Sequence, residues 1–386
     1  MGLEKKKIIV FTGARSEYGL LKPLIQLLLK QEQFETEIAV AGGHLSKNQG
    51  YTVTEIDADN FPIAIKMDHM EETEDASAVS ISNGQLQIQF AKFLSNYKPD
   101  LVIVLGDRSE LIPVVSSCLF QSIPVAHISG GEVTEGATDN QVRHAVSKMS
   151  HIHFPATETY KENLLKMGEE EWRICVSGEP GLDEILSIEL PSKTEFCENF
   201  GLPLIEPLVI ATFHSETIGQ TINKAFLTDL IQELCTKTNA HFLFTAANTD
   251  VGGAEINDTL QEISEQNERV TFVHSLGRIN YYAAQRYSSL MLGNSSSGLV
   301  EAHSFGIPVI NVGARQDGRL RNANVIDVPV DIPAILEAYS KAIDPKFKAS
   351  IQQIPNIYGD GHASQKIVDF IAKIDWSRLL LKRSTF

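Results

Sequence analysis

A short polar turn in the second half of the chain follows an apolar run and could bind an anion. The run 290–292 ends at Gly293, and Asn294-Ser295-Ser296-Ser297-Gly298 leads into a stretch of helical character. Backbone N–H groups that open a helix have no partner within it, and beside serine hydroxyls they can receive phosphate oxygens. Glu301 lies about one turn further on, where its carboxylate could accept hydrogen bonds from ribose hydroxyls. The turn therefore predicts a nucleotide site, although a capped helix with nothing bound would explain it as well.

Other side chains capable of chemistry also come just after apolar runs. In the first half they are Arg15, Ser16, Asp107, Arg108 and Glu132, with Asp139, Arg143 and His144 a few residues later; in the second half they are His214, Asn248, Ser275 and Arg315. Neighbouring carboxylates can act as general acid and base, and arginine can bind a phosphate through two parallel hydrogen bonds. Any one of these carboxylates taken alone is better explained as a helix cap or an arginine partner. Their recurrence at many strand ends favours a shared site.

The elements that carry these residues alternate regularly between strand and helix. The expected strands are 7–12, 35–41, 101–105, 125–129 and 151–156, then 208–212, 241–245, 270–274, 290–292 and 309–312. Short continuous apolar runs are typical of parallel strands covered on both faces, and the helical spacing at 20–30 and 85–97 provides crossovers. We therefore expect an α/β protein with two Rossmann-like, doubly wound domains facing a central cleft, since such sheets bind ligands at the carboxyl ends of their strands.

The chain length suits two domains of ordinary size. The segment 187–207 of the 386 residues is charged, contains proline and lacks strong periodicity, so we place the domain junction near residue 190. This predicts an N-terminal domain at 1–190 and a C-terminal, nucleotide-binding domain at 191–364. The amphipathic stretch at 365–381 predicts a helix, and we expect 365–386 to pack back on the first domain.

Composition excludes several classes of protein. No apolar run approaches bilayer length, and the N-terminus runs directly into a strand without room for a signal peptide, so we expect a cytoplasmic protein with no membrane partner. The four cysteines are widely separated, and His151 and His153 lack a third ligand at metal spacing; neither a disulfide framework nor a metal site is expected. His127 and His303 are interpreted as structural. The net charge of −16 argues against nucleic acid as a partner.

Taken as a set, the motifs resemble those of the hydrolysing UDP-N-acetylglucosamine 2-epimerases. The matching segments are 13–18, 42–46, 106–108, 127–132, 143–145, 177–180 and 293–298, and the likeness extends in order from about residue 7 to 370. The resemblance implies a glycosyltransferase-B-like fold and the conversion of UDP-N-acetylglucosamine and water to N-acetylmannosamine and UDP, which supplies sialic-acid synthesis. It also implies a homodimer or homotetramer that needs no cofactor. A sister group with nearly the same motifs acts on UDP-N,N′-diacetylbacillosamine in legionaminic-acid synthesis.

The resemblance also implies roles for individual residues. The reaction removes the C2 proton while the C1–O bond to UDP breaks, and water then adds to the 2-acetamidoglucal with the opposite configuration at C2. Asp107, Glu132 and Asp139 match the acid and base carboxylates, with the residue that takes the C2 proton left open. Arg15, His214 and Arg315 match diphosphate contacts, His214 could also assist the leaving group, and Ser296, Ser297 and Glu301 match the phosphate and ribose contacts. The other predicted substrate contacts are Ser16, Arg108, Arg143, His144, Asn248, Ser275 and Ser295.

One departure and three alternatives remain. Many relatives carry an Asp-Asp pair where this chain has Asp139-Asn140, which puts an acid or base role for the second position in question. Non-hydrolysing epimerases, which re-add UDP, carry a Glu-Ala-Gly-Leu-Arg type of segment where this chain has 129–133 (Ser-Gly-Gly-Glu-Val), so hydrolysis is favoured. A glycosyltransferase would need an acceptor site. A non-catalytic UDP-sugar binder would not need carboxylates at several strand ends.

Overall fold

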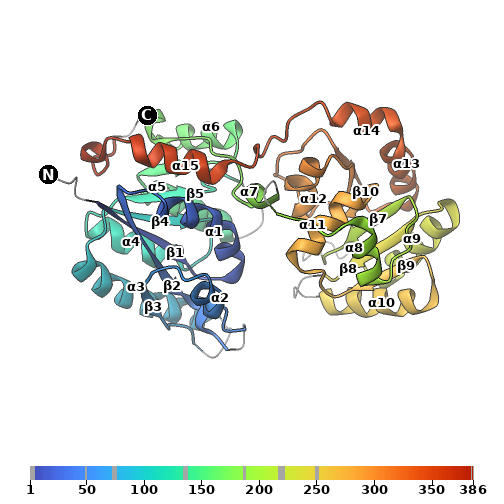
Figure 1. Ribbon diagram of the computed structural model, residues 1–386, viewed down its shortest axis with the longest axis horizontal. Helices are drawn as coiled ribbons and strands as arrows, with labels where there is room; N and C mark the ends of the chain where they lie inside the picture. Colours follow the sequence, from blue (N-terminus) through green and yellow to red (C-terminus); the bar gives the residue numbers. More distant parts are fainter. Residues whose placement is uncertain are drawn as a thin grey trace. The chain divides into compact units, whose positions relative to one another are not determined.

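The computed structural model describes residues 5–47, 50–71, 76–133, 138–185, 188–215, 222–247, 252–383 and 385 (Figure 1). The chain forms two compact units. Unit 1 consists of Met1–Glu184 and Tyr358–Phe386, and unit 2 of Ile185–Ile357. Each unit contains a six-stranded parallel sheet with helices on both faces, so the predicted class of two doubly wound α/β domains is confirmed.

Unit 1 has the strand order β3-β2-β1-β4-β5-β6. Its strands are β1 (Lys6–Thr12), β2 (Phe34–Ala41), β3 (Ile63–Met67), β4 (Leu101–Leu105), β5 (Val125–Ile128) and β6 (Ile152–Phe154). Its helices are α1 (Arg15–Leu29), α2 (Val53–Ala58), α3 (Ala76–Tyr97), α4 (Leu111–Phe120), α5 (Thr138–Met149), α6 (Glu158–Lys166), α7 (Gly181–Ile185) and α15 (Ala363–Lys373), with 3-10 turns at η1 (Gly42–Leu45), η2 (Glu171–Arg173) and η4 (Trp376–Arg378).

Both faces of this sheet are apolar because side chains alternate along each strand. In β1, Ile8 and Val10 join the core under α1 and α15, whereas Ile9 and Phe11 join the core under α3 and α4. The C-terminal helix α15 lies beside α1 and buries Ile367 in the first of these cores (Figure 1). The last helix of the chain therefore completes the layer that covers the first strand.

Unit 2 repeats the plan with the order β12-β11-β10-β7-β8-β9. Its strands are β7 (Leu208–Thr212), β8 (His241–Thr245), β9 (Val270–Val273), β10 (Leu290–Gly293), β11 (Val309–Val312) and β12 (Val325–Val328). Its helices are α8 (Lys193–Phe200), α9 (Lys224–Lys237), α10 (Gly253–Gln266), α11 (Gly277–Tyr287), α12 (Ser296–Val300), α13 (Ile332–Ile343) and α14 (Pro345–Ile351), with a 3-10 turn at η3 (Ala302–Phe305). Leucines of α9 and Ile335 of α13 pack on one face of the sheet.

Each strand expected from the sequence is present, with ends that differ by no more than two residues. Two strands were not expected, β3 and β12, which lie at sheet edges and contain Lys66 and Asp327. An edge strand is only half covered, so it tolerates charge and lacks the continuous apolar pattern. The helices differ from the expectation at two places. One helix, α8, was not expected, since it lies in the segment 187–207 that lacks strong periodicity, and α15 ends at Lys373 rather than near 381.

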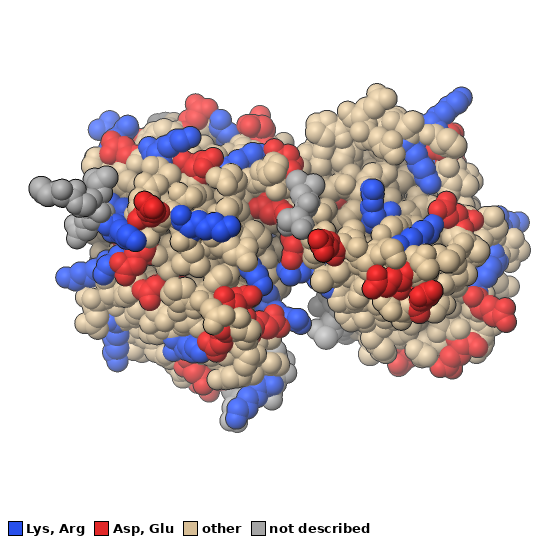
Figure 2. Space-filling view, in the orientation of Figure 1, with Lys and Arg blue, Asp and Glu red and all other residues tan. Residues whose placement is uncertain are grey.

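The surface carries charges of both signs. On the face shown in Figure 2, Lys and Arg side chains are interspersed with Asp and Glu side chains over both units. Among the helices that the structure describes, none is long and apolar enough to cross a bilayer.

Candidate active site

In unit 1, a buried arginine joins two of the predicted carboxylates. Asp107 follows β4, Glu132 follows β5, and Arg143 comes from α5. The Arg143 guanidinium forms an ion pair with Asp107 through Nη2, while Nη1 lies 3.2 Å from Glu132 Oε2 and donates to the Ser129 carbonyl at 2.8 Å. Only 5% of the Arg143 side chain is exposed, against 24% for Asp107 and 15% for Glu132. The arginine thus holds two half-buried carboxylates at neighbouring strand ends.

The loop that carries Glu132 needs its glycines. Gly131 has a φ of 80°, and a Cβ there would lie 2.5 Å from the Tyr160 carbonyl oxygen. No other residue fits this backbone without moving α6. The conformation of the Ser-Gly-Gly-Glu segment is therefore set by its packing against α6, which fixes the position of the Glu132 backbone.

Asp139 lies in the first turn of α5, close enough to Asp107 to sense its charge. Burial raises the pKa of Asp139, the negative charge of Asp107 raises it further, and Arg143 and Arg108 oppose the rise. Asp139 therefore retains a proton more readily than an isolated aspartate, a property suited to a general acid. His144, the next residue after Arg143, has a lowered pKa because of burial and the arginine charge, so it is neutral near pH 7.

A second charged group in unit 1 lies around the turn after β1. Glu17 is buried and accepts hydrogen bonds from the backbone N–H groups of Gly13 at 2.8 Å and Ala14 at 3.0 Å. Burial raises the pKa of Glu17 to about 7. Arg108 pairs with Glu110 at 2.7 Å. Glu17 and Glu110 were not among the predicted site residues, because a carboxylate in the first turn of a helix, or just before it, has the sequence signature of a cap.

Arg15 and Ser16 lie at the exposed start of α1. The Arg15 side chain is 71% exposed and pairs with Glu55 at 2.8 Å, a contact of the kind that a competing anion can replace. Ser16 is exposed beside it. Their predicted contact with a diphosphate stays a prediction.

Two histidines interpreted as structural are buried and bonded. His127 lies between the Gly106 carbonyl at 2.7 Å and Ser147 Oγ at 3.0 Å, and burial lowers its pKa to about 3. His303 Nε2 is 2.6 Å from the Ile354 carbonyl oxygen. Over the described residues, no group of His, Cys, Asp and Glu has the arrangement of a metal site.

In unit 2, the serine turn 293–298 begins where β10 ends. Ser295 occupies the residue before α12, where its side chain makes no capping hydrogen bond to the helix backbone. Its hydroxyl lies 2.9 Å from Ser297 Oγ, which is 2.6 Å from the Tyr281 hydroxyl of α11. The predicted helix is shorter than the sequence suggested, since α12 ends at Val300 and η3 follows. A five-residue helix has a small dipole, so the serine turn can attract an anion mainly through its first N–H groups and its hydroxyls.

Glu301 stands at the junction of α12 and η3 and faces α11. Its Oε2 accepts a hydrogen bond from Gln285 Nε2 at 2.8 Å, and burial raises the pKa of Glu301 to about 7. Gln285 itself is fully buried. The carboxylate is thus held in place by one amide and kept in a poorly solvated position.

His214 and Arg315 both contact Asn294 of the serine turn. The Asn294 side chain accepts from the His214 N–H at 2.7 Å and donates to the His214 carbonyl at 2.9 Å, and its backbone carbonyl accepts from Arg315 Nη1 at 3.3 Å. The Ser275 hydroxyl makes a local hydrogen bond, which it accepts from the backbone N–H of Gly277 at the start of α11. Asn248 lies outside the described residues.

Tyr281, Gln285 and Asn294 contact predicted site residues, namely Ser297, Glu301 and His214, but were not themselves predicted. Tyr281 and Gln285 are one turn apart on α11, which would have placed them on one helix face, but a tyrosine and a glutamine in a helix carry no specific signal. Asn294 was within a recognised motif, yet its role depends on a contact with residue 214, which the sequence cannot supply.

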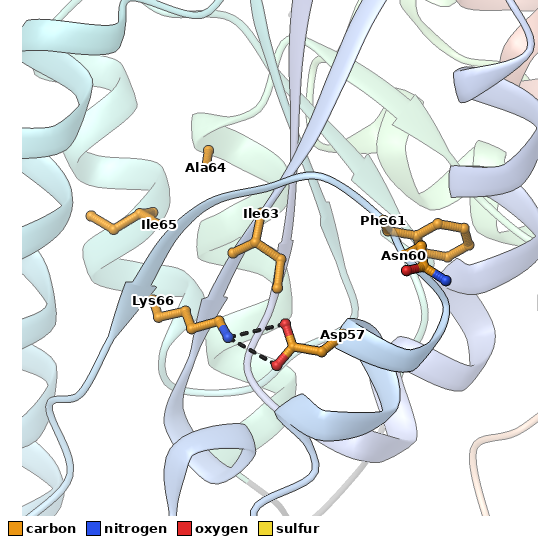
Figure 3. Close-up of a pocket in the computed structure, with 7 residues that line it drawn as sticks. All are labelled: Asp57, Asn60, Phe61, Ile63, Ala64, Ile65 and Lys66. Carbon is orange, nitrogen blue, oxygen red and sulfur yellow. Dashed lines mark hydrogen bonds and ion pairs between the residues drawn. The ribbon is translucent and has the colours of Figure 1, made fainter.

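A shallow surface pocket in unit 1 lies elsewhere. It is lined by Asp57, Asn60, Phe61, Ile63, Ala64, Ile65 and Lys66, at the edge formed by α2 and β3 (Figure 3). Lys66 Nζ contacts both oxygens of Asp57, at 3.1 and 3.0 Å. This pair neutralises the pocket, which contains none of the predicted site residues.

Two parallel doubly wound units, with polar and ionisable side chains at the carboxyl ends of their strands, define the glycosyltransferase-B-like class of two-domain α/β proteins. A family model described as UDP-N-acetylglucosamine 2-epimerase matches residues 26–372, and the chain belongs to this family.

Two relatives illustrate the membership, and one solved structure shares the fold. The chain is 36% identical over 381 residues to the UDP-N,N′-diacetylbacillosamine 2-epimerase (hydrolyzing) of Legionella pneumophila, with 98% of each protein covered. It is 34% identical over 347 residues to the GDP/UDP-N,N′-diacetylbacillosamine 2-epimerase (hydrolyzing) of Campylobacter jejuni, with 90% of each covered. The crystal structure of UDP-GlcNAc 2-epimerase from Neisseria meningitidis bound to UDP-GlcNAc matches with a TM-score of 0.79 and 21% identity, covering 95% of this chain and all of that one, a likeness of fold.

Proposed function

We propose that this chain is a hydrolysing 2-epimerase of a UDP-2-acetamido sugar, which releases UDP and the free sugar inverted at C2. The observation that carries the proposal is the carboxylate group of unit 1, where Arg143 joins Asp107 and Glu132 and where the pKa of Asp139 is raised. Membership in the epimerase family supports the same reaction class. A binding module would have no use for clustered carboxylates whose desolvation costs free energy.

The reaction needs groups with different protonation states. In the elimination half, a carboxylate takes the C2 proton and the C1–O bond to UDP breaks, leaving the 2-acetamidoglucal. In the hydration half, a hydroxyl from water adds at C1 and a proton is returned to C2 from the opposite face. Asp107 or Glu132, paired with Arg143, is suited to the base, and Asp139 to the acid. Arg143 keeps the carboxylates close together because its charge offsets their repulsion.

Unit 2 has the groups that a UDP leaving group requires. The N–H groups and hydroxyls of the serine turn, with Arg315, suit the diphosphate, and Glu301 suits the ribose hydroxyls. His214, hydrogen-bonded to Asn294 of that turn, is suited to assist the departing diphosphate oxygen. Binding the charge that develops on UDP lowers the barrier for C1–O cleavage.

The sequence motifs indicated UDP-N-acetylglucosamine as the first choice of substrate. The names of the two relatives instead favour UDP-N,N′-diacetylbacillosamine. The two sugars share the 2-acetamido group and UDP, and they differ at C4 and C6. Purified protein incubated with each UDP-sugar separately, with turnover compared at equal concentrations, tests the choice. We expect faster release of UDP from the diacetylbacillosamine substrate, and equal or faster turnover of UDP-N-acetylglucosamine would reverse the assignment.

Running the preferred reaction in heavy water tests the mechanism. A carboxyl group that water reaches exchanges its proton, so the free 2-epimer should carry deuterium at C2, which NMR detects. A mixed pool of UDP-sugars would indicate non-hydrolytic epimerisation, and a free sugar of unchanged configuration with its original C2 proton would indicate direct hydrolysis. Absence of any reaction with both substrates, with UDP still bound, would leave a glycosyltransferase or a UDP-sugar binder.

A further inference from the structure

Asn294 forms hydrogen bonds with every polar group it has. Its N–H donates to the Thr212 carbonyl at 3.1 Å, and its side chain makes the two bonds to His214 described above. Its carbonyl accepts from both Arg315 Nη1 at 3.3 Å and Gln316 Nε2 at 2.9 Å. The residue is completely buried, and Gln316 is 3% exposed. Asn294 therefore connects the segments that follow β7, β10 and β11.

Only asparagine can make the paired contact with His214. The Asn294 carboxamide accepts a hydrogen bond from the His214 N–H and donates one to the His214 carbonyl. These two bonds replace those that a neighbouring β-strand would make to the same backbone groups. Aspartate would lose the donor, serine would not reach both groups, and glutamine is one methylene longer. The preceding Gly293 permits the approach, since its φ is 133° and a Cβ there would lie 1.9 Å from the Thr212 carbonyl oxygen.

We propose that Asn294 is a positioning residue that fixes the His214 backbone and the Arg315 segment in one arrangement around the serine turn. This inference rests on the proposed function, in which His214 and Arg315 act on the diphosphate. His214 is held by the side-chain amide of Asn294, whereas the Arg315 segment is held by its backbone carbonyl. A substitution of the 294 side chain therefore acts first on His214, and loss of the Gln316 bond acts on the Arg315 segment. Gln316 is the second anchor of the Arg315 segment, through its bond to the Asn294 carbonyl.

The test is a pair of double-mutant cycles. The first combines Asn294→Asp with His214→Ala and measures kcat at saturating substrate. Asn294→Asp alone should lower kcat by about 10- to 100-fold, the cost of a misplaced group, whereas in the His214→Ala background it should lower kcat by less than about threefold. A carboxylate at 294 repels UDP equally in both backgrounds, so the difference between the two losses isolates positioning.

The matched control is Asn324→Asp. Asn324 is equally buried and donates Nδ2 to the Ile307 carbonyl at 2.7 Å, which precedes β11 at the opposite end of the sheet. It should reduce thermal stability about as much as Asn294→Asp while kcat stays within about twofold of the wild type. A parallel loss of kcat in the control would show that stability alone explains the effect and would overturn the proposal.

The second cycle uses a substitution that introduces no charge and measures binding instead of turnover. It can be carried out even if the Asn294→Asp protein fails to fold. Gln316→Leu should weaken UDP binding in calorimetry by about three- to tenfold, and in the Arg315→Ala background it should have no further effect. Equal losses in both backgrounds, in either cycle, would refute positioning. If the wild type binds UDP yet turns over neither sugar, the proposed function fails, while the calorimetric cycle still decides whether the bond from Gln316 to the Asn294 carbonyl positions Arg315.

Discussion

Replacing Glu301 with glutamine should stabilise the protein and weaken UDP binding at once. The carboxylate is partly buried against α11, accepts one hydrogen bond from Gln285, and has a pKa raised by burial from 4.5 to about 7. A group whose pKa is higher in the folded state binds protons more tightly there than in the unfolded chain. Stability therefore falls as the pH rises from 4.5 through 7, and the whole penalty is present above pH 7.

The size of the penalty follows from the two pKa values. At about 1.36 kcal/mol per pKa unit, the ionised Glu301 costs about 3 kcal/mol of folding free energy above pH 7. The residue has intermediate solvent exposure, and solvent screening reduces this cost to about 2 kcal/mol. The glutamine amide carries no charge and escapes the penalty. The free energy of unfolding of Glu301→Gln should thus exceed that of the wild type by about 2 kcal/mol at pH 8.5 and by nearly nothing at pH 4.

Urea unfolding at several pH values measures this difference without ligand. Both tryptophans, Trp172 and Trp376, belong to unit 1, so a transition seen by circular dichroism but not by tryptophan fluorescence reports on unit 2. Glu265→Gln is a matched control, because Glu265 also accepts from a glutamine amide, that of Gln261 at 2.7 Å, but is exposed. It should change stability by less than about 0.5 kcal/mol at every pH.

Binding should move in the opposite direction. Loss of the charged acceptor for the ribose hydroxyls should weaken UDP binding to Glu301→Gln by about 1.5–3 kcal/mol. A charged side chain that is buried in order to bind a ligand destabilises the free protein, so removing its charge raises stability and weakens binding. If the variant is no more stable than the wild type at pH 8.5, the burial argument is wrong, and if it binds UDP normally, Glu301 does not contact the nucleotide.

Three further expectations concern other residues. Asp107→Asn or Glu132→Gln should lower turnover by about two to four orders of magnitude with little change in UDP affinity, and near-normal turnover would assign that residue to structure. Arg315→Ala should weaken UDP binding by about 1.5–3 kcal/mol in calorimetry, a prediction that unchanged affinity would contradict. Gly293→Ala should cost more than about 3 kcal/mol of stability because its Cβ would overlap a carbonyl oxygen, whereas Gly84→Ala on α3, where a Cβ meets nothing within 4 Å, should stabilise the protein by about 0.5–1 kcal/mol in thermal unfolding.

Much of the fold could be predicted because parallel strands have a local signature. A strand covered on both faces must be apolar at consecutive positions, so β4 and β7 are visible as short continuous runs. The edge strands β3 and β12 were not predicted because their outer sides tolerate charged residues. Helix α8 was not predicted because its charged residues hide the apolar periodicity of a helix. These failures share one cause: local pattern weakens where an element is only half buried.

The sequence by itself determined which residues come at strand ends and which motifs they form, since both depend only on order along the chain. The tertiary structure decided which of them meet. Arg143 pairs with Asp107 across 36 positions, and Asn294 bonds to His214 across 80. The pKa of Glu301 is raised because its carboxyl group is buried, and the local sequence gives no sign of this burial. Such pairings and desolvation depend on sheet order and on layer packing, which bring together side chains that no local pattern relates.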